Sequence, residues 1–346
     1  YQLVDSTITP GQLFAYRLIE RKFLGQTFEH GTGTAIPWST SPPANFLTVG
    51  PLGDYADIQS AINAIATAQP VISVATGTYP SFTITGGLGT MVRIYADGSG
   101  PVIIDTTTGP VQILNLTAFD SAELSDLVIG NGASSNIGVL IQNCQGLVIL
   151  DELEVHGGIG QPGIDVSASV RTTIQKSVVD GTPGVLTENG SLMFMSRGSL
   201  DDLEVTGISD ATTCQLVTVS TVAPGSSLTE LTGTMPDVAV TEFPGLGGPF
   251  VVDLQAHPGV LFGLAYSVSV GWAQIPGFEM VGLVNLLTAV PLAQGVLPTG
   301  TKTLNLNLPA TGAIWGLPIG LQMVAIDLSN VTLRFSNLAT IIPTGS

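Results

Sequence analysis

A loose repeat in the middle of the chain is the feature that most limits its fold. Four similar segments follow one another at spacings of 26, 24 and 26 residues. Matching positions in these segments form three columns that are apolar in eleven of twelve places: Leu124, Leu150, Ile174 and Leu200; Leu127, Leu153, Ser177 and Leu203; Ile129, Val155, Val179 and Val205. Apolar side chains at fixed offsets in a repeat of this length are typical of a stacked solenoid. Each coil of a solenoid buries its inward side chains against the coils above and below.

The region before the repeat has a different period. Ile58, Ala61, Ile62 and Ile65 are spaced as on one face of a helix. We predict a short helix that covers the open end of the solenoid, where strand edges would otherwise be exposed. Later in each coil, Gly138, Gly163 and Gly184 precede short apolar segments, which we predict to be strands.

The opening of this region resembles a known group of proteins. Asp57–Ala64, then Val71–Val74, then Gly77–Tyr79 are similar to the start of pectin-lyase-like right-handed parallel β-helix proteins. The resemblance implies an all-β, right-handed parallel β-helix. It does not imply one activity, since the group includes polysaccharide lyases, glycoside hydrolases, tailspikes, adhesins and non-catalytic surface proteins.

We divide the chain into three parts. Residues 1–50 hold a strand at Gln12–Glu20 without an obvious partner, followed by a Gly/Pro/Ser-rich linker from Gly31 to Pro51. Residues 51–240 form the β-helix. Residues 241–346 contain strand-like runs separated by Gly/Pro turns, which predict a β-sandwich-like domain. At the end of this domain, Leu317–Asp327 followed by Ser336–Leu338 is similar to C-terminal modules of large secreted bacterial surface proteins.

Composition excludes several classes of partner. The net charge is −17, with 9 basic and 26 acidic residues, so we expect neither nucleic acid nor an anionic membrane surface as a partner. Charged residues make up only 10% and the mean hydropathy is +0.45. The most apolar region, Val260–Leu297, is interrupted by Gly263, Pro276 and Pro291, so we predict strands there and no membrane span.

The outward positions of the repeat supply the candidate site residues. A general acid or base would come from Glu152, Glu154 or Asp180, and calcium ligands from Asp126, Glu152, Asp180 and Asp202. The alternative is a solvated acidic face on which Lys176 relieves repulsion between its neighbours. We expect no other cofactor. The hydrolase branch of the resembled group has paired-aspartate, Gly-His-Gly and Arg-x-Lys motifs, and only the pair Asp201-Asp202 occurs here.

Cysteine and histidine give no support for a metal or nucleophile site. Cys144 and Cys214 fall on different coils, which favours two free thiols over a disulfide. His30, His156 and His257 lie far apart in the sequence, so a zinc site is not expected.

Two functional hypotheses follow. The first is a non-catalytic extracellular structural or cell-surface protein that self-assembles into a fibre, filament or layer through strand addition and apolar contacts. The rigid solenoid, the low charge and the lack of a catalytic motif favour it. The alternative is a carbohydrate-active enzyme, either a polysaccharide lyase or a glycoside hydrolase, or a glycan-binding protein that uses a groove on the β-helix.

Overall fold

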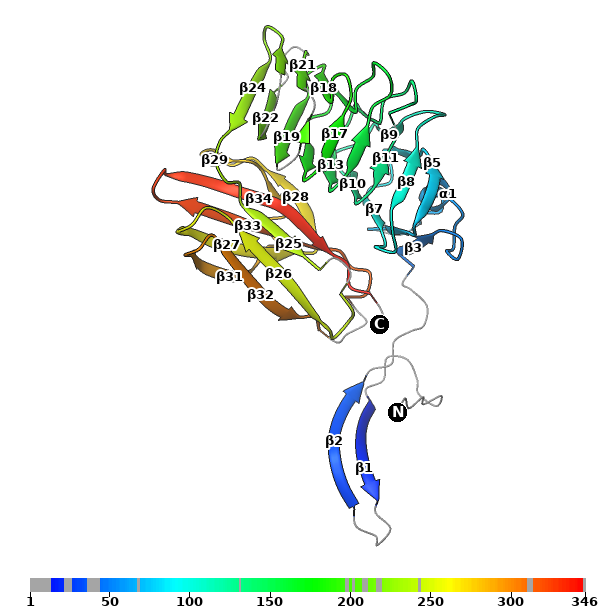
Figure 1. The fold of residues 1–346 in the computed structure, drawn as a ribbon, viewed down its shortest axis with the longest axis vertical. Coiled ribbons are helices and arrows are strands. Elements are labelled where there is room, and N and C mark those ends of the chain that lie inside the picture. The colour runs from blue at the N-terminus through cyan, green and yellow to red at the C-terminus, as the bar shows by residue number, and fades with distance from the viewer. Residues whose placement is uncertain are drawn as a thin grey trace.

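The computed structural model describes residues 14–21, 27–35, 44–66, 69–130, 132–196, 199–200, 203–206, 211–215, 220–241, 244–309 and 314–344. Its central part is a solenoid of three parallel sheets, and β-sheets of a second domain lie beside it (Figure 1). The prediction of an all-β chain with a right-handed parallel β-helix and further β-structure at the C-terminus is confirmed.

Among the described residues, six successive coils contribute one strand to each sheet in turn, and the coils at the two ends contribute fewer. Sheet 1 contains β3 (Phe46–Val49), β4 (Val71–Val74), β7 (Met91–Ala96), β10 (Ser121–Ser125), β13 (Leu147–Asp151), β16 (Thr172–Gln175), β19 (Leu192–Ser196), β22 (Ala211–Gln215) and β24 (Ser227–Leu231). Sheet 2 contains β5 (Gly77–Pro80), β8 (Val102–Asp105), β11 (Val128–Ile129), β14 (Glu154–His156), β17 (Val178–Asp180) and β20 (Ser199–Leu200). Sheet 3 contains β6 (Thr83–Thr85), β9 (Val111–Leu114), β12 (Val139–Gln142), β15 (Ile164–Ser167), β18 (Val185–Glu188), β21 (Leu203–Val205) and β23 (Ser220–Val222).

The predicted columns hold for the first three segments. Leu124, Leu150 and Ile174 are register partners in sheet 1, and all three are fully buried. Ile129, Val155 and Val179 are partners in sheet 2. Ser177, the polar member of its column, is satisfied because its hydroxyl donates to the Gln175 carbonyl at 2.7 Å and accepts from the Leu153 amide at 3.1 Å.

The predicted fourth member of each column is wrong. Ile174 pairs with Met195, and Leu200 pairs with Val179 in sheet 2. Leu203 and Val205 pair with Val185 and Thr187 in sheet 3. The coil after Ile174 is only 21 residues long. A predicted spacing of 26 residues therefore reaches past the matching position in sheet 1 and selects residues that belong to the next sheet.

The N-terminal end of the solenoid is capped as predicted. Helix α1 (Ile58–Asn63) buries Ile58, Ala61 and Ile62 against the core and contacts β3 and β4. Its N-cap is Asp57, whose carboxylate accepts the Ser60 amide at 2.7 Å.

Two expectations about residues 1–50 are wrong. Strand β1 (Phe14–Arg21) has a partner, because it pairs antiparallel with β2 (Thr27–Ala35). The stretch from Gly31 to Pro51 is not linker throughout, since it contains the end of β2 and all of β3, the first strand of sheet 1. The missed strand β2 is rich in Gly and Thr, which hides it from a search for apolar alternation.

The C-terminal domain has two main sheets around one apolar core, and their strands pair antiparallel except for one parallel pair at the edge of the second sheet. One sheet contains β25 (Asp237–Val240), β26 (Pro249–Gln255) and β32 (Thr301–Asn307). The other contains β29 (Phe278–Glu279), β34 (Thr332–Ile341), β33 (Ile319–Asp327), β27 (Val260–Ser267) and β31 (Val290–Leu297). A small third sheet pairs β28 (Val270–Ala273) with β30 (Gly282–Val284). The apolar region Val260–Leu297 forms strands here, and among the described residues no helix is long and apolar enough to cross a membrane.

Candidate functional site

The outer face of sheet 1 is covered by the C-terminal domain. Met91, Ile149 and Phe194 on the solenoid form one buried cluster with C-terminal residues such as Leu283 and Phe335. The Phe194 and Trp272 rings meet edge to face, with centroids 5.4 Å apart. The Gln175 side chain accepts the Leu338 amide at 2.8 Å and donates to its carbonyl at 3.3 Å. This face is an interdomain contact and is not open to a large ligand.

Charged residues on that face belong to the same contact. Arg93 Nε donates to Glu123 Oε2 at 2.9 Å, and the Thr340 hydroxyl of the C-terminal domain donates to Glu123 Oε1 at 2.9 Å. The Tyr95 hydroxyl also bonds to Glu123. Burial, reinforced by the Glu123 charge, raises the pKa of Tyr95 well above its usual value, so the phenol stays protonated and donates.

Sheet 2 carries the candidate site at its junction with sheet 1. At this junction Asp126, Glu152 and Lys176 occupy the same turn position in successive coils, with φ of 57°, 53° and 46°. The left-handed backbone turns their side chains outward, while the following Leu127, Leu153 and Ser177 stay buried in the core. Adjacent coils are about 4.8 Å apart, so the three side chains form a stack.

A cavity of about 290 Å³ opens beside this stack. Its described lining combines three carboxylates with small and aliphatic residues: Asp126, Glu152, Glu154, Leu127, Val128, Val102, Pro101, Gly98 and Gly100. We call this the acidic groove. Of the predicted catalytic candidates, Glu152 and Glu154 therefore lie together in one groove, and Asp126 joins them.

The two turn carboxylates have different environments. Desolvation, followed by the negative charge of Glu152, raises the pKa of Asp126. Glu152 accepts a hydrogen bond from Lys176 Nζ at 2.7 Å in an ion pair. Burial by itself would lower the pKa of Lys176, but the charges of Asp151, Glu152 and Asp237 outweigh it and raise that pKa. Lys176 therefore stays charged beside Glu152.

Asp180 is connected to the groove through a histidine that the sequence did not single out. His156 Nδ1 lies 2.8 Å from Asp180 Oδ2, and His156 Nε2 lies 3.0 Å from Glu154 Oε1. His156 and Asp180 are register partners on β14 and β17. The signal was present in the sequence as the outward column of Gly130, His156 and Asp180, one step beyond the column of Glu154.

The predicted calcium ligands do not form one cluster. Asp126 and Glu152 lie in the groove, Asp180 bonds to His156, and Asp202 lies outside the described residues. Within the described part of the chain, no group of three or more His, Cys, Asp or Glu side chains has an arrangement that could hold a metal ion. Cys144 is a buried free thiol, whereas the side chain of Cys214 lies outside the described part.

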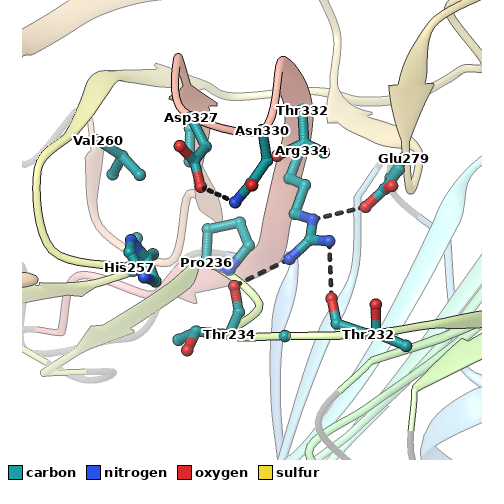
Figure 2. A pocket seen from close by; sticks show the side chains of 13 residues that line it. Thr232, Thr234, Pro236, His257, Val260, Glu279, Asp327, Asn330, Thr332 and Arg334 are labelled. Carbon is teal, nitrogen blue, oxygen red and sulfur yellow. Dashed lines mark hydrogen bonds and ion pairs between the residues drawn. The ribbon is translucent and has the colours of Figure 1, made fainter.

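A second cavity, of about 350 Å³, lies between the C-terminal domain and the segment that leads into it (Figure 2). The Arg334 guanidinium is part of its wall. Arg334 donates to Glu279 Oε2 at 2.5 Å, to the Thr234 carbonyl at 3.2 Å and to the Thr232 carbonyl at 2.8 Å. Figure 2 shows these three contacts converging on one side chain, which ties the connecting segment to β34 and β29. We interpret this cavity as a structural contact between the connecting segment and the C-terminal domain, and not as a ligand site.

Comparison with known proteins gives a likeness of fold. No family model matches the chain, and no curated protein matches its sequence. Two solved structures of the pectin methylesterase from Aspergillus niger match, one deglycosylated and one penultimately deglycosylated. The first is 15% identical with a TM-score of 0.28, and the match covers 54% of this chain and 70% of that one. The second is 16% identical with a TM-score of 0.27, and covers 55% and 70%.

Proposed function

We propose that this chain is a carbohydrate-active protein that acts outside the cell and cleaves a polysaccharide in the acidic groove. One observation carries the proposal: two carboxyl groups on adjacent coils share a groove but differ in environment. Asp126 has a raised pKa, whereas Glu152 is paired with Lys176. Glycoside hydrolases use two carboxyl groups in different environments, one of them with a raised pKa, as an acid and a base.

In the proposed reaction Asp126 is the general acid and Glu152 the base. The protonated Asp126 carboxyl gives its proton to the glycosidic oxygen as the bond to the anomeric carbon breaks. The ionised Glu152 takes a proton from a water molecule that attacks the same carbon. Lys176 Nζ donates to Glu152 Oε1 at 2.7 Å and holds this carboxylate in place at the groove. Glu154 lines the groove beside them and contributes hydrogen bonds to the sugar.

Charge narrows the substrate class. The groove contains three carboxylates, and the whole chain has a net charge of −17. A polyanion such as a polyuronate would be repelled by this surface, so the proposal is for a neutral polysaccharide or one that carries amino groups. The expectation that the protein binds calcium stays a prediction, and the assay below includes it.

The experiment is a screen for new reducing ends with neutral, cationic and anionic polysaccharides, each with and without calcium. We expect product from a neutral or cationic polymer, and a loss of about 10²-fold or more in rate for Asp126→Asn and for Glu152→Gln. Glu204→Gln on sheet 3 is the matched control and keeps full activity. No product from any polymer, or equal activity in all four proteins, contradicts the proposal.

The hypothesis of a self-assembling structural protein stays a prediction with less support than it had. One of its motives was an unpaired N-terminal strand free to join a neighbouring sheet, and β1 pairs with β2 in the same chain. Light scattering over a range of concentrations tests the remaining part of that hypothesis.

A further inference from the structure

The contact between Glu154, His156 and Asp180 crosses two coils of sheet 2. His156 is mostly buried, with 23% of its side chain exposed, while Glu154 and Asp180 are 55% and 44% exposed. Both ring nitrogens of His156 are within 3.0 Å of a carboxylate oxygen. The His156 ring is therefore held on both sides, by Glu154 on its own coil and by Asp180 on the next coil.

Glu154 has few other means of holding its position. Its register partners in the neighbouring coils are Val128 and Val178, whose side chains offer no hydrogen bond. Among the described residues, His156 is the polar side chain to which Glu154 is bonded. A glutamate that is half exposed and flanked by valines would otherwise sample several rotamers, at an entropic cost to any ligand that needs one of them.

We infer that His156 is a positioning residue for the acidic groove, which fixes the Glu154 carboxylate in the ligand-binding orientation while Asp180 on the next coil fixes the His156 ring. This inference rests on the proposed function and assigns two further residues to the same site. His156 itself does not line the groove, so it acts through Glu154.

A spectroscopic experiment tests the contact independently of activity. The chain has three histidines, so the ring nitrogen resonances of ¹⁵N-histidine protein are few enough to assign by substitution. We expect the His156 ring resonances to move in Glu154→Gln and in Asp180→Asn, with those of His257 unchanged. If the chemical shifts of the His156 ring nitrogens are unchanged in both variants, the inference is wrong, regardless of any activity on polysaccharides.

A kinetic experiment tests the role. With a polysaccharide that the wild type cleaves, we expect His156→Ala to raise KM about tenfold and to leave kcat within about twofold. Glu154→Gln should raise KM to a similar degree, and Asp180→Asn to a smaller one. Added imidazole should restore part of the lost affinity of His156→Ala. His257→Ala, an exposed histidine of the C-terminal domain, is the matched control.

The outcomes separate the two proposals. If Glu154→Gln raises KM but His156→Ala does not, the positioning role is wrong while the proposed function stands. If His156→Ala lowers kcat and KM is unchanged, His156 takes part in the chemistry and the inference is also wrong. If the wild type cleaves no polysaccharide, the proposed function fails and this inference fails with it.

Discussion

At the residue scale, backbone conformation decides which side chains reach the groove. Asp126, Glu152 and Lys176 all adopt the left-handed conformation, which costs a residue with a Cβ roughly 1 kcal/mol. Each coil accepts this cost because the same sharp turn must carry the chain from sheet 1 to sheet 2. The stack of outward side chains is therefore a consequence of the turn, and its chemistry depends on which polar residues occupy it.

Asp165 allows a test of stability against pH at this scale. It lies on the outer side of β15, its register partners are Leu140 and Leu186, and its buried Oδ1 has no hydrogen-bond partner among the described residues. Burial, with a smaller effect of the Glu188 charge, raises the pKa of Asp165 to about 6. The folded state therefore prefers the protonated form, and the contribution to stability is complete below pH about 4 and is lost as the pH rises through about 6.

We accordingly expect Asp165→Asn to increase the free energy of unfolding at pH 8 by about 1–2 kcal/mol, with a smaller effect at pH 4. Urea unfolding at both pH values measures it. Equal effects at the two pH values, or a loss of stability at pH 8, would contradict the assignment of the raised pKa to Asp165.

At the scale of elements, the sequence predicts the coils that repeat regularly and fails where the coil length changes. Leu124, Leu150 and Ile174 follow spacings of 26 and 24 residues, and the next member, Met195, comes after only 21. The segment that begins at Leu200 is similar in sequence to the earlier segments, but its residues lie in sheets 2 and 3. Any inward position of a solenoid is apolar, so a pattern of apolar residues does not say which sheet it belongs to.

The sequence predicted which residues of the candidate site face outward, but not how they contact one another. Glu152, Glu154 and Asp180 follow from the outward positions of the repeat, because alternation along a strand fixes which side chains face out. That His156 bridges Glu154 and Asp180 depends on rotamers and on ring geometry, which sequence spacing does not encode. The different environments of Asp126 and Glu152 likewise depend on burial within the folded coils.

The column of sheet 1 provides a prediction for the solenoid core. Leu150 is fully buried between Leu124 and Ile174, so Leu150→Ala leaves a cavity that neighbouring coils cannot fill. We expect a loss of about 3–4 kcal/mol in the free energy of unfolding. Val178→Ala, at a position that is 46% exposed on sheet 2, should cost less than about 1 kcal/mol. Comparable losses in the two variants by denaturant unfolding would mean that Leu150 does not point into a packed core.

At the scale of the whole molecule, the C-terminal domain stabilises the solenoid. It covers sheet 1 with an apolar cluster, and Gln175 and Glu123 make hydrogen bonds across the contact. The sequence does not predict this contact. The outward residues of sheet 1 include both apolar and charged side chains, as an ordinary solvent-exposed surface does. The contact also explains why the groove lies at the edge of sheet 2, since the face of sheet 1 is occupied.

This contact predicts how the chain unfolds. Because the interface is buried, apolar and hydrogen-bonded, we expect solenoid and C-terminal domain to unfold together in one transition. Phe194→Ala removes the ring that meets Trp272, and Gln175→Ala removes both bonds to Leu338. Together they should separate the transition into two and lower the first midpoint by several degrees, as followed by tryptophan fluorescence and circular dichroism.

Leu287→Ala, at a side chain that is 96% exposed, is the control and should change neither the midpoint nor the shape of the unfolding transition. Two transitions already present in the wild type would show that the domains are stable independently and that the contact adds little.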